Sequence, residues 1–444
     1  MSLEEYGAQA LTAAQAAGAE EAEAYLSRSR SFVVEVADGK VETLHQSTET
    51  GLGLRVFRRG CLGFAFTTDL SPGGLRAAAE TAVANAAATA SDPFNRLPGF
   101  TPAEPLDLVD PVLRDLSTEA KIDTAMAIER AARAFDRRVT RVEKATYTDG
   151  DHAVAILNTR GVRAGYSGTS VSGSITVVAE AGGSAETGWS YLFSHRRAGV
   201  DPEAIGREAA EKAVQLLGAR TIGTKRVALI FDPLVAAEFL ETIGPALSAD
   251  AVQKGKSLFA DKVGEKVASP LVQVVDDGRL VEGAGAAPVD DEGVPTGRTV
   301  LIRDGVLQGF LHNTYTAAKG GTSSTGNGIR ASFRGTPEVR PSNLYLAAGK
   351  APREQLIAEV SEGFYVTAVM GMHTVNPISG DFSVGAAGLW IEHGRLARPV
   401  RGVAIAGNLL DLLSGVEAVG DDLRFLGSAG SPSLRIAPVT VSGE

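Results

Sequence analysis

Histidines are the side chains that most readily bind a catalytic metal, and six of them are scattered along the chain: His45, His152, His195, His312, His373 and His393. No two of them lie within five residues of one another. The chain therefore lacks the HExxH and HExxxH spacings, in which one helix carries two imidazole ligands of a zinc ion. Histidines without such a neighbour are more often structural or surface residues, so these six predict no metal site.

Nucleophiles for covalent catalysis are also sparse. The single cysteine, Cys61, follows Arg59 and Gly60, which predict a hairpin turn, and strand packing explains a small side chain at this position. A thiolate stabilised by the nearby arginines is the functional alternative. The G-x-S-x-G pattern of a serine nucleophile does not occur in the sequence.

Three glycine-containing patterns could bind phosphate or a divalent cation. GNGIRA at residues 326–331 fits the dinucleotide pattern G-x-G-x-x-A, but a polar loop precedes it where a strand is required. The acidic runs DDG at 276–278 and DDEG at 290–293 offer fewer alternating oxygen ligands than Mg²⁺ or Ca²⁺ needs. We interpret all three as turns, because Asp and Gly favour the backbone angles of turns.

The elements that must position these residues begin with an Ala-rich amphipathic helix over residues 3–17. Turn signals at Asp38-Gly39 and Arg59-Gly60 then separate short alternating segments, which predict an antiparallel meander. Its expected strands are residues 25–36, 40–46, 52–57 and 62–67, and a helix over residues 74–88 follows.

Five prolines between residues 92 and 111 exclude a helix or a central strand, so this part is expected to be a long ordered excursion or linker. The order of helix, meander and helix then returns, with helices over residues 118–135 and 202–217. This order suggests a duplication, although the two units show no residue-level identity.

The pattern of apolar and glycine residues changes near residue 220. A buried-strand pattern at 227–231 precedes a helix over residues 233–244, and short strands in a glycine-rich context follow. We therefore predict an α+β fold of two domains. Residues 1–220 form the helix–antiparallel meander–helix domain, and residues 221–444 form a β-rich mixed domain.

Composition limits the choice of partners. A net charge of −10, spread along the chain, disfavours nucleic acid, which requires a basic face. No apolar run is long enough to predict a membrane span. One cysteine permits no disulfide framework, and MSLEE at the start has no secretory signal pattern, so a cytoplasmic location is expected.

A series of short blocks carries a resemblance to the TldD/PmbA family, which is associated with peptide maturation and proteolysis. The blocks come in the order and spacing of that family: VDDG at 275–278, DDEG at 290–293, TGNG at 325–328, NPISGDF at 376–382, IEHG at 391–394, PVRG at 399–402 and IAGN at 405–408. The blocks lie between residues 275 and 408, and the resemblance as a whole extends over nearly all of residues 225–444. The first half resembles the family more loosely, through DGKVE at 38–42 and GLGLRV at 51–56.

The resemblance implies two kinds of subunit. TldD-type chains carry HExxxH on a helix and a cysteine near the C-terminus as zinc ligands, whereas PmbA-type chains, also called TldE, lack them. In this sequence the motif aligns with LETIGP at 240–245, so Leu240 and Pro245 replace the histidines and only Glu241 remains. The C-terminal stretch FLGSAG at 425–430 contains no cysteine. Leu and Pro offer a metal no lone pair, and Glu241 without a metal has no bound water to deprotonate.

The resemblance therefore implies a non-catalytic, PmbA-like subunit with no metal or cofactor of its own. Zinc is expected in a TldD-type partner, with which this chain would degrade peptides or unfolded protein. Asn376, Ser379, Gly380 and Asp381 are the candidates for a peptide cleft, although the same residue types also form turns. Two alternatives remain open: a homodimeric scaffold that binds peptides without cleaving them, and a self-sufficient hydrolase that uses dispersed residues such as His373 and Glu241.

Overall fold

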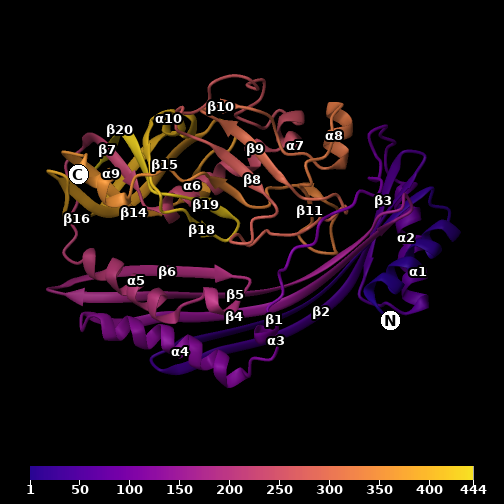
Figure 1. The fold of residues 1–444 in the computed structure, drawn as a ribbon, viewed down its shortest axis with the longest axis horizontal. Helices are drawn as coiled ribbons and strands as arrows, with labels where there is room; N and C mark the ends of the chain where they lie inside the picture. The colour runs from indigo at the N-terminus through magenta and orange to yellow at the C-terminus, as the bar shows by residue number, and fades with distance from the viewer. Residues whose placement is uncertain (444) are drawn as a thin grey trace.

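The computed structural model describes residues 1–443 and has the predicted α+β fold (Figure 1). Its N-terminal half is built on one six-stranded antiparallel sheet with the strand order β3-β2-β1-β4-β5-β6. The strands are β1 (Glu21–Ala37), β2 (Lys40–Arg58), β3 (Cys61–Thr67), β4 (Val139–Asn158), β5 (Arg163–Ala181) and β6 (Ser184–Ser194). The helices are α1 (Leu3–Ala16), α2 (Pro72–Ala86), α3 (Pro111–Arg114), α4 (Thr118–Phe135) and α5 (Pro202–Gln215), with a 3₁₀ turn η1 (Arg197–Gly199) before α5.

One strand differs from the prediction. The segments expected at residues 40–46 and 52–57 are parts of a single long strand, β2. The polar residues between them do not form a turn, because each pairs with β1 in register, from Ser47 opposite Ser31 to Gly51 opposite Ser27. A strand that is exposed on both faces does not need apolar residues at alternate positions. The polar residues in the middle of β2 therefore resembled a break between two strands.

The N-terminal half repeats one arrangement twice, as α1-β1-β2-β3-α2 and as α4-β4-β5-β6-α5. The two units meet where β1 pairs antiparallel with β4, in the middle of the sheet. A side chain at Gly63 in β3 would lie 2.0 Å from the carbonyl oxygen of Ala82 in α2. The equivalent side chain at Gly188 in β6 would lie 2.0 Å from the carbonyl oxygen of Ala209 in α5. Both units therefore use a glycine at the same strand–helix contact, which supports the suggested duplication.

The C-terminal half contains two further six-stranded sheets. The first has the order β16-β15-β14-β7-β20-β17, and an additional pairing between β16 and β20 closes it on itself. Its strands are β7 (Lys225–Phe231), β14 (Glu362–Met370), β15 (Asp381–Glu392), β16 (Arg395–Asn408), β17 (Val416–Val419) and β20 (Leu434–Ser442). The second has the order β10-β9-β8-β13-β19-β18 and consists of β8 (Val274–Asp277), β9 (Arg298–Arg303), β10 (Val306–Leu307), β13 (Leu344–Leu346), β18 (Arg424–Leu426) and β19 (Ala429–Ser431).

Short elements complete this half: the strand pair β11 (Gly328–Ile329) and β12 (Glu338–Val339), the helices α6 (Pro233–Ile243), α7 (Ala249–Gln253), α8 (Thr314–Gly320), α9 (Arg353–Ala358) and α10 (Leu409–Ser414), and the 3₁₀ turns η2 (Gly244–Leu247) and η3 (Met372–Thr374). Helix α6 contacts strands of both large sheets, among them β14 and β19. Most of its residues are buried, so α6 lies in the centre of the largest apolar core.

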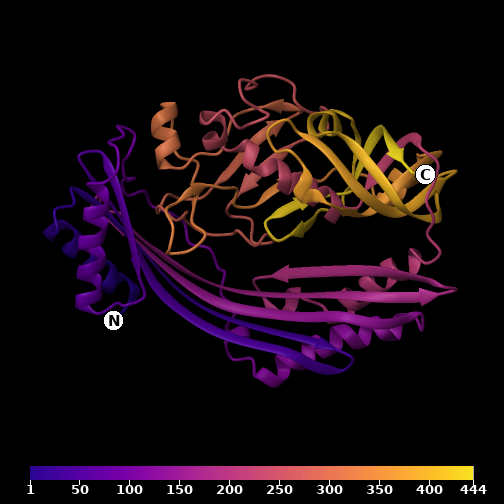
Figure 2. The same ribbon diagram turned by 180° about the vertical axis from the view of Figure 1, so that it is seen from behind.

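The C-terminal half lies over one face of the N-terminal sheet, and α4 lies on the opposite face (Figures 1 and 2). The proline-rich segment 92–111 is ordered and contacts both halves. The carbonyl of Leu108 accepts a hydrogen bond from the backbone N–H of Thr169 in β5 at 2.8 Å. The carbonyl of Glu104 accepts one from the guanidinium of Arg279 in the C-terminal half at 3.1 Å. The segment therefore links the two halves through its backbone.

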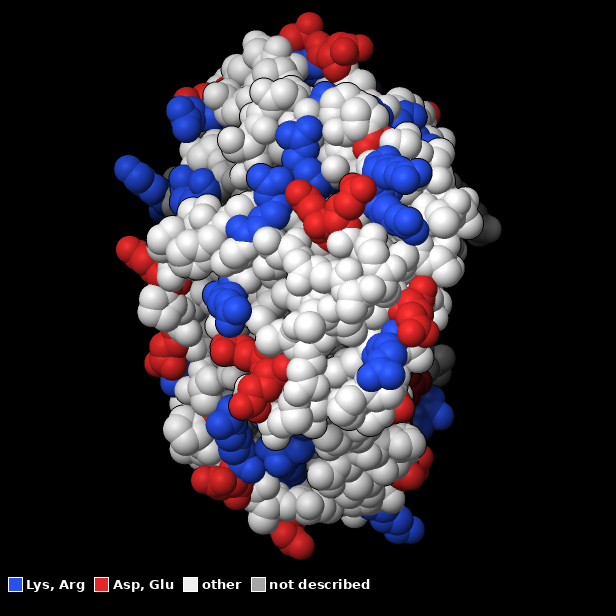
Figure 3. Space-filling model, turned by 90° about the vertical axis from the view of Figure 1, so that its right-hand side faces the viewer, with Lys and Arg blue, Asp and Glu red and all other residues white. Residues whose placement is uncertain are grey.

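Basic and acidic side chains are interspersed over the face of the molecule in Figure 3. Within residues 1–443, no helix has both the length and the apolar composition that a membrane-crossing helix needs.

Candidate functional site

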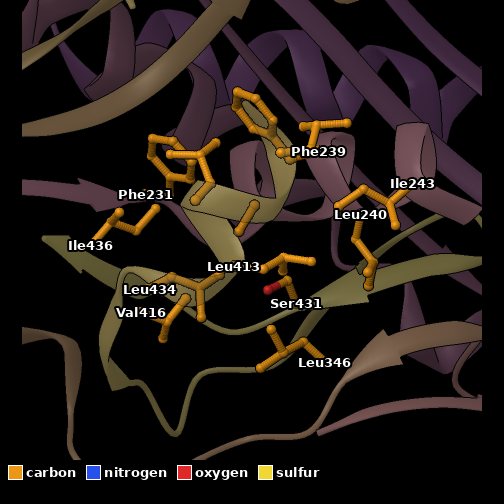
Figure 4. Close-up of a pocket in the computed structure, with 13 residues that line it drawn as sticks. Phe231, Phe239, Leu240, Ile243, Leu346, Leu413, Val416, Ser431, Leu434 and Ile436 are labelled. Carbon is orange, nitrogen blue, oxygen red and sulfur yellow. The ribbon is translucent and has the colours of Figure 1, made fainter. Parts of the chain in front are cut away.

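Helix α6 carries the position that the resemblance assigns to the first zinc ligand. The helix begins at Pro233, after Asp232, whose carboxylate caps it by accepting the backbone N–H of Leu234 at 3.1 Å. Leu240, in its last turn, is only 4% exposed. Its side chain lines a small cavity of about 30 Å³ among Phe, Leu, Ile and Val side chains, with Ser431 as the polar member (Figure 4).

A zinc ion does not fit this environment. Carbon atoms surround Leu240 on almost every side, and desolvating a divalent cation without donor atoms carries a large free-energy cost. Pro245, the other position, is exposed and lies in the 3₁₀ turn η2 that follows α6. Five residues turn about 500° on a helix, which leaves two side chains about 140° apart. In the structure Pro245 lies beyond the end of α6, so the two positions do not share one helix, and one is buried while the other is exposed.

Glu241 lies on the exposed side of α6. One turn earlier on the helix, Glu238 is half-buried, and burial together with the charge of Glu241 raises the pKa of Glu238 to about 7. The sequence analysis did not single out Glu238, although its spacing of three residues from Glu241 puts both carboxylates on one face of the helix. This face can hold or release a proton near neutral pH.

The loop that contains the cleft candidates follows η3 and leads into β15. The side-chain oxygen of Asn376 accepts the backbone N–H groups of Ile378 and Ser379 at 2.9 and 3.1 Å. The hydroxyl of Ser379 donates to the carboxylate of Asp381 at 2.8 Å, and Gly380 has a φ of +81°. The amide of Asn408 and the Ser379 hydroxyl hold the pKa of Asp381 below its usual range. These contacts account for the residue types as those of a turn, and the role of the loop in a peptide cleft stays a prediction.

The loop nevertheless lies next to α6. Phe382, directly after Asp381, packs the edge of its ring against Phe239 of α6, with ring centroids 5.4 Å apart. At the tip of the loop, Ile378 is 51% exposed. The degenerate motif and the loop therefore share one region of the C-terminal half. His373 lies in η3 of the same region, but within residues 1–443 it forms no hydrogen bond or ion pair with Glu241.

The acidic run at residues 290–293 has a second role besides turn formation. As predicted, it forms a turn, in which the carboxylate of Asp290 accepts the backbone N–H groups of Glu292 and Val294 at 3.0 and 2.9 Å. In addition, the carboxylate of Glu292 accepts a hydrogen bond from the guanidinium of Arg55 in β2 at 2.9 Å. The run therefore connects the two halves of the molecule.

Four fully or almost fully buried charges make up this contact, and we call Glu23, Arg55, Glu292 and Arg330 the interdomain ionic cluster. Arg55 holds Glu23 with two hydrogen bonds, at 3.1 and 2.7 Å, and Glu23 also pairs with Arg330. The sequence analysis missed the cluster because its partners lie far apart in the chain, by 237 residues for Arg55 and Glu292. No short motif signals such a pairing.

Beside this cluster, a cavity of about 390 Å³ lies between the two halves. His152 and Tyr166 line it from the N-terminal sheet, while Asp290, Asp291 and Arg340 line it from the C-terminal half. Burial raises the pKa of Asp291 to about 6, and burial together with the nearby His195 lowers the pKa of His152. The cavity thus has titratable groups on both walls. Within residues 1–443, no three or more His, Cys, Asp or Glu side chains are grouped so that they could hold a metal ion.

Three parts of the chain match the domain models of one known protein family. Residues 224–443 match the model of the C-terminal domain of PmbA/TldA metallopeptidases. Residues 111–217 match the central domain of the same family, and residues 22–86 match its domain 1. The chain therefore belongs to the PmbA/TldD family of metallopeptidases, as its sequence blocks suggested.

Individual relatives span almost the whole chain. The metalloprotease PmbA of Escherichia coli O157:H7 is 29% identical over 431 residues, which cover 95% of this chain and 92% of that protein. A metalloprotease TldD homolog of Haemophilus influenzae is 30% identical over 446 residues, covering 94% and 91%. The crystal structure of TldE from Thermococcus kodakarensis superposes with a TM-score of 0.92 at 25% identity, covering 99% of this chain and 100% of that one. Overall identity is therefore nearly equal for relatives named PmbA and TldD.

Proposed function

We propose that this chain is the non-catalytic subunit of a heteromeric metalloprotease, in which a TldD-type partner supplies the zinc ion and the general base. The observation that carries the proposal is the position of Leu240, which is packed into the apolar core where the resemblance expects a histidine. Overall identity does not distinguish the two kinds of subunit, since relatives of both names match equally well. The residues at positions 240 and 245 are what favour the PmbA-like kind.

The contribution of the chain to such a complex is to shape the space in which peptides are cleaved. Strand β2 supports this role, because β3 covers only its second half, from Leu52 onward. From Lys40 to Gly51, β2 pairs with β1 on one side, and no strand within residues 1–443 pairs with its other edge. An exposed edge of this kind binds an extended peptide or a partner strand through backbone hydrogen bonds, with little demand on sequence.

The same edge also favours the second candidate, a homodimeric protein that binds peptides without cleaving them. Val41 and Leu44 in this segment are each 41% exposed, so a bound strand would also cover apolar surface. The two candidates differ in whether the complex with a partner cleaves peptides. They therefore require the same experiment.

The experiment is peptide cleavage by the purified chain, alone and mixed with a TldD-type chain from the same organism, with zinc counted by elemental analysis. We expect cleavage only in the mixture, and zinc in proportion to the partner. A second mixture, in which the partner has been stripped of zinc, should be inactive until zinc is restored. Cleavage and stoichiometric zinc in the chain alone would refute the proposal, and binding of peptides without cleavage in any mixture would favour the homodimeric candidate.

A further inference from the structure

The two repeated units of the N-terminal half can be compared residue by residue. The glycines of the repeated strand–helix contact, Gly63 and Gly188, pair with Val56 of β2 and Val177 of β5. These two valines are therefore equivalent, and the same offset relates every other residue of β2 to one of β5. In both units the third strand covers only the second half of its neighbour, since β6 begins to cover β5 at Val171.

The first half of β5 is closed by the proline-rich segment of the same chain. Just before β5, the carbonyl of Pro98 accepts a hydrogen bond from the side chain of Asn158 at 2.9 Å. Farther along, the carbonyl of Leu108 accepts the backbone N–H of Thr169 at 2.8 Å, and Thr169 is fully buried. Between these contacts, the segment and the start of β5 line one cavity. In the second unit, an extended segment thus completes the edge of the sheet.

The first half of β2 has no such cover. The offset makes Thr48 the equivalent of Thr169, and Thr48 is exposed. Because the backbone groups of successive strand residues point to opposite sides, Thr48 directs its N–H away from β1, as Thr169 does away from β4. Within residues 1–443, no backbone carbonyl accepts this N–H group. The first unit therefore lacks the extended segment that the second unit has.

The uncovered edge also has an apolar margin. Leu44 lies opposite Val34 and Val41 lies opposite Val36, so each pair shares one face of the sheet. Val34 and Val36 are fully buried in the core that includes α4, whereas Leu44 and Val41 are each 41% exposed. The core beneath α4 thus reaches the margin of the sheet without a cover, and an added segment would bury this surface.

Both ends of the edge are held in place by the rest of the chain. Next to Lys40, the backbone N–H of Gly39 donates to both carboxylate oxygens of Glu129 in α4, at 3.2 and 3.1 Å. At the other end, Glu49 accepts a hydrogen bond from the guanidinium of Arg334 at 3.0 Å. An edge that is already fixed loses little conformational freedom when a strand adds to it.

On the basis of the proposed function, we propose that an extended segment of the TldD-type partner adds to β2 between Lys40 and Gly51, as segment 98–108 lies beside β5. A substrate peptide leaves after cleavage and would expose Val41 and Leu44 again, whereas the equivalent cover of β5 is a fixed part of the fold. A second copy of this chain carries the same net charge of −10, which disfavours self-association. The partner segment therefore fits the edge better than either.

The first test is hydrogen exchange of the full chain, followed by mass spectrometry. The chain is measured alone at two concentrations, with the TldD-type chain from the same organism, and with oxidised insulin B chain as an unfolded peptide. We expect exchange in residues 40–51 to slow at least 10-fold with the partner and in no other sample. Equal slowing with the peptide would overturn the proposal, as would slowing of the chain alone at the higher concentration.

The second test measures association of the two chains by sedimentation velocity. Leu44→Asp places a charge on the apolar margin, and Thr48→Pro removes an N–H group that has no partner in residues 1–443. Each variant should weaken association at least 10-fold. Leu396→Asp is the matched control, because Leu396 in β16 is also 41% exposed, and it should leave association unchanged. Melting temperatures of the separate chains show whether each variant is folded.

The outcomes separate this binding surface from the proposed function. A mixture that associates and cleaves peptides, while residues 40–51 exchange as fast as in the chain alone, would refute the surface and leave the proposed function standing. Normal association of both Leu44→Asp and Thr48→Pro would do the same. A mixture that neither associates nor cleaves peptides would refute both.

Discussion

Replacing Arg55 by methionine tests whether the interdomain ionic cluster holds the two halves together. Arg55 is 5% exposed and makes contacts with Glu23 and Glu292, whose side chains are fully buried. After the substitution, Glu23 keeps its contact with Arg330, whereas within residues 1–443 Glu292 keeps only the hydrogen bond from the backbone N–H of Thr314. One carboxylate is then buried without a counter-charge.

The expected cost follows from that arrangement. Removing one partner of a buried ion pair typically lowers the free energy of unfolding by about 3–5 kcal/mol. This is a large part of the total of about 5–15 kcal/mol that a domain has. Adding Glu292→Gln to Arg55→Met removes the orphaned charge as well, so the double variant should be less destabilised than the sum of the two single variants.

The assay is urea unfolding, followed by circular dichroism and by tryptophan fluorescence, because a chain of several domains can unfold in more than one step. Arg334→Met is the matched control, since Arg334 also joins the two halves through Glu49, but on the exposed surface. Exposed pairs contribute little to stability, so this variant should unfold close to the wild type. A loss below about 1 kcal/mol in Arg55→Met, or strict additivity in the double variant, would refute the reasoning.

Three further predictions concern α6, the repeated strand–helix contact and the carboxylate pair. Leu240→His should lower the free energy of unfolding by about 1–3 kcal/mol in urea titrations, because the imidazole loses its hydration and Ser431 is the single polar residue that lines the cavity. Gly188→Ala should lower it by about 1–3 kcal/mol, since the new methyl group would lie 2.0 Å from the carbonyl oxygen of Ala209. Glu238 has a raised pKa of about 7, so its contribution to stability is present below its unfolded pKa and is lost as the pH rises through 7. The melting temperature should therefore fall between pH 5 and pH 8 by an amount that Glu238→Gln removes.

Each of these variants has a control in the same chain. Pro245→His, at an exposed position, should change stability little, and a larger loss than in Leu240→His would contradict the burial argument. Gly99→Ala should be tolerated because, among residues 1–443, no atom beyond its chain neighbours lies within 4 Å of the place that the new methyl group would take. Equal losses at both glycines would rule out the steric explanation. Glu241→Gln should shift the pH-dependent step toward lower pH, since the charge of Glu241 helps raise the pKa of Glu238. A step that stays in place would show that burial alone sets it.

The sequence predicted helices and strands well where both a cap or turn residue and a regular spacing of apolar residues were present. Helix α4 has the predicted bounds of Thr118–Phe135, because Ser117 caps its start and its apolar residues recur at helical spacing. The α+β class followed from the same kind of evidence. The continuous β2 was missed because its middle is exposed on both faces and therefore lacks apolar alternation.

The sites were harder to predict because their chemistry depends on distant residues. Position 240 was recognised as degenerate through the resemblance to TldD-type chains, and burial in the structure gives the physical reason why it cannot hold zinc. In contrast, Arg55 and Glu292 form no local pattern, because 237 residues separate them in the chain. Sequence alone reveals a lost motif more readily than a contact between segments far apart.

The repeated units of the N-terminal half have a consequence for the path of the chain. Two copies of one unit that pair through the same strand about a twofold axis must do so antiparallel, as β1 and β4 do. Because of this symmetry, the end of the first unit and the start of the second do not lie side by side. Helices α2 and α4 lie toward opposite ends of the sheet, so the chain needs a long connection between them (Figure 2). The proline-rich segment 92–111 provides this connection.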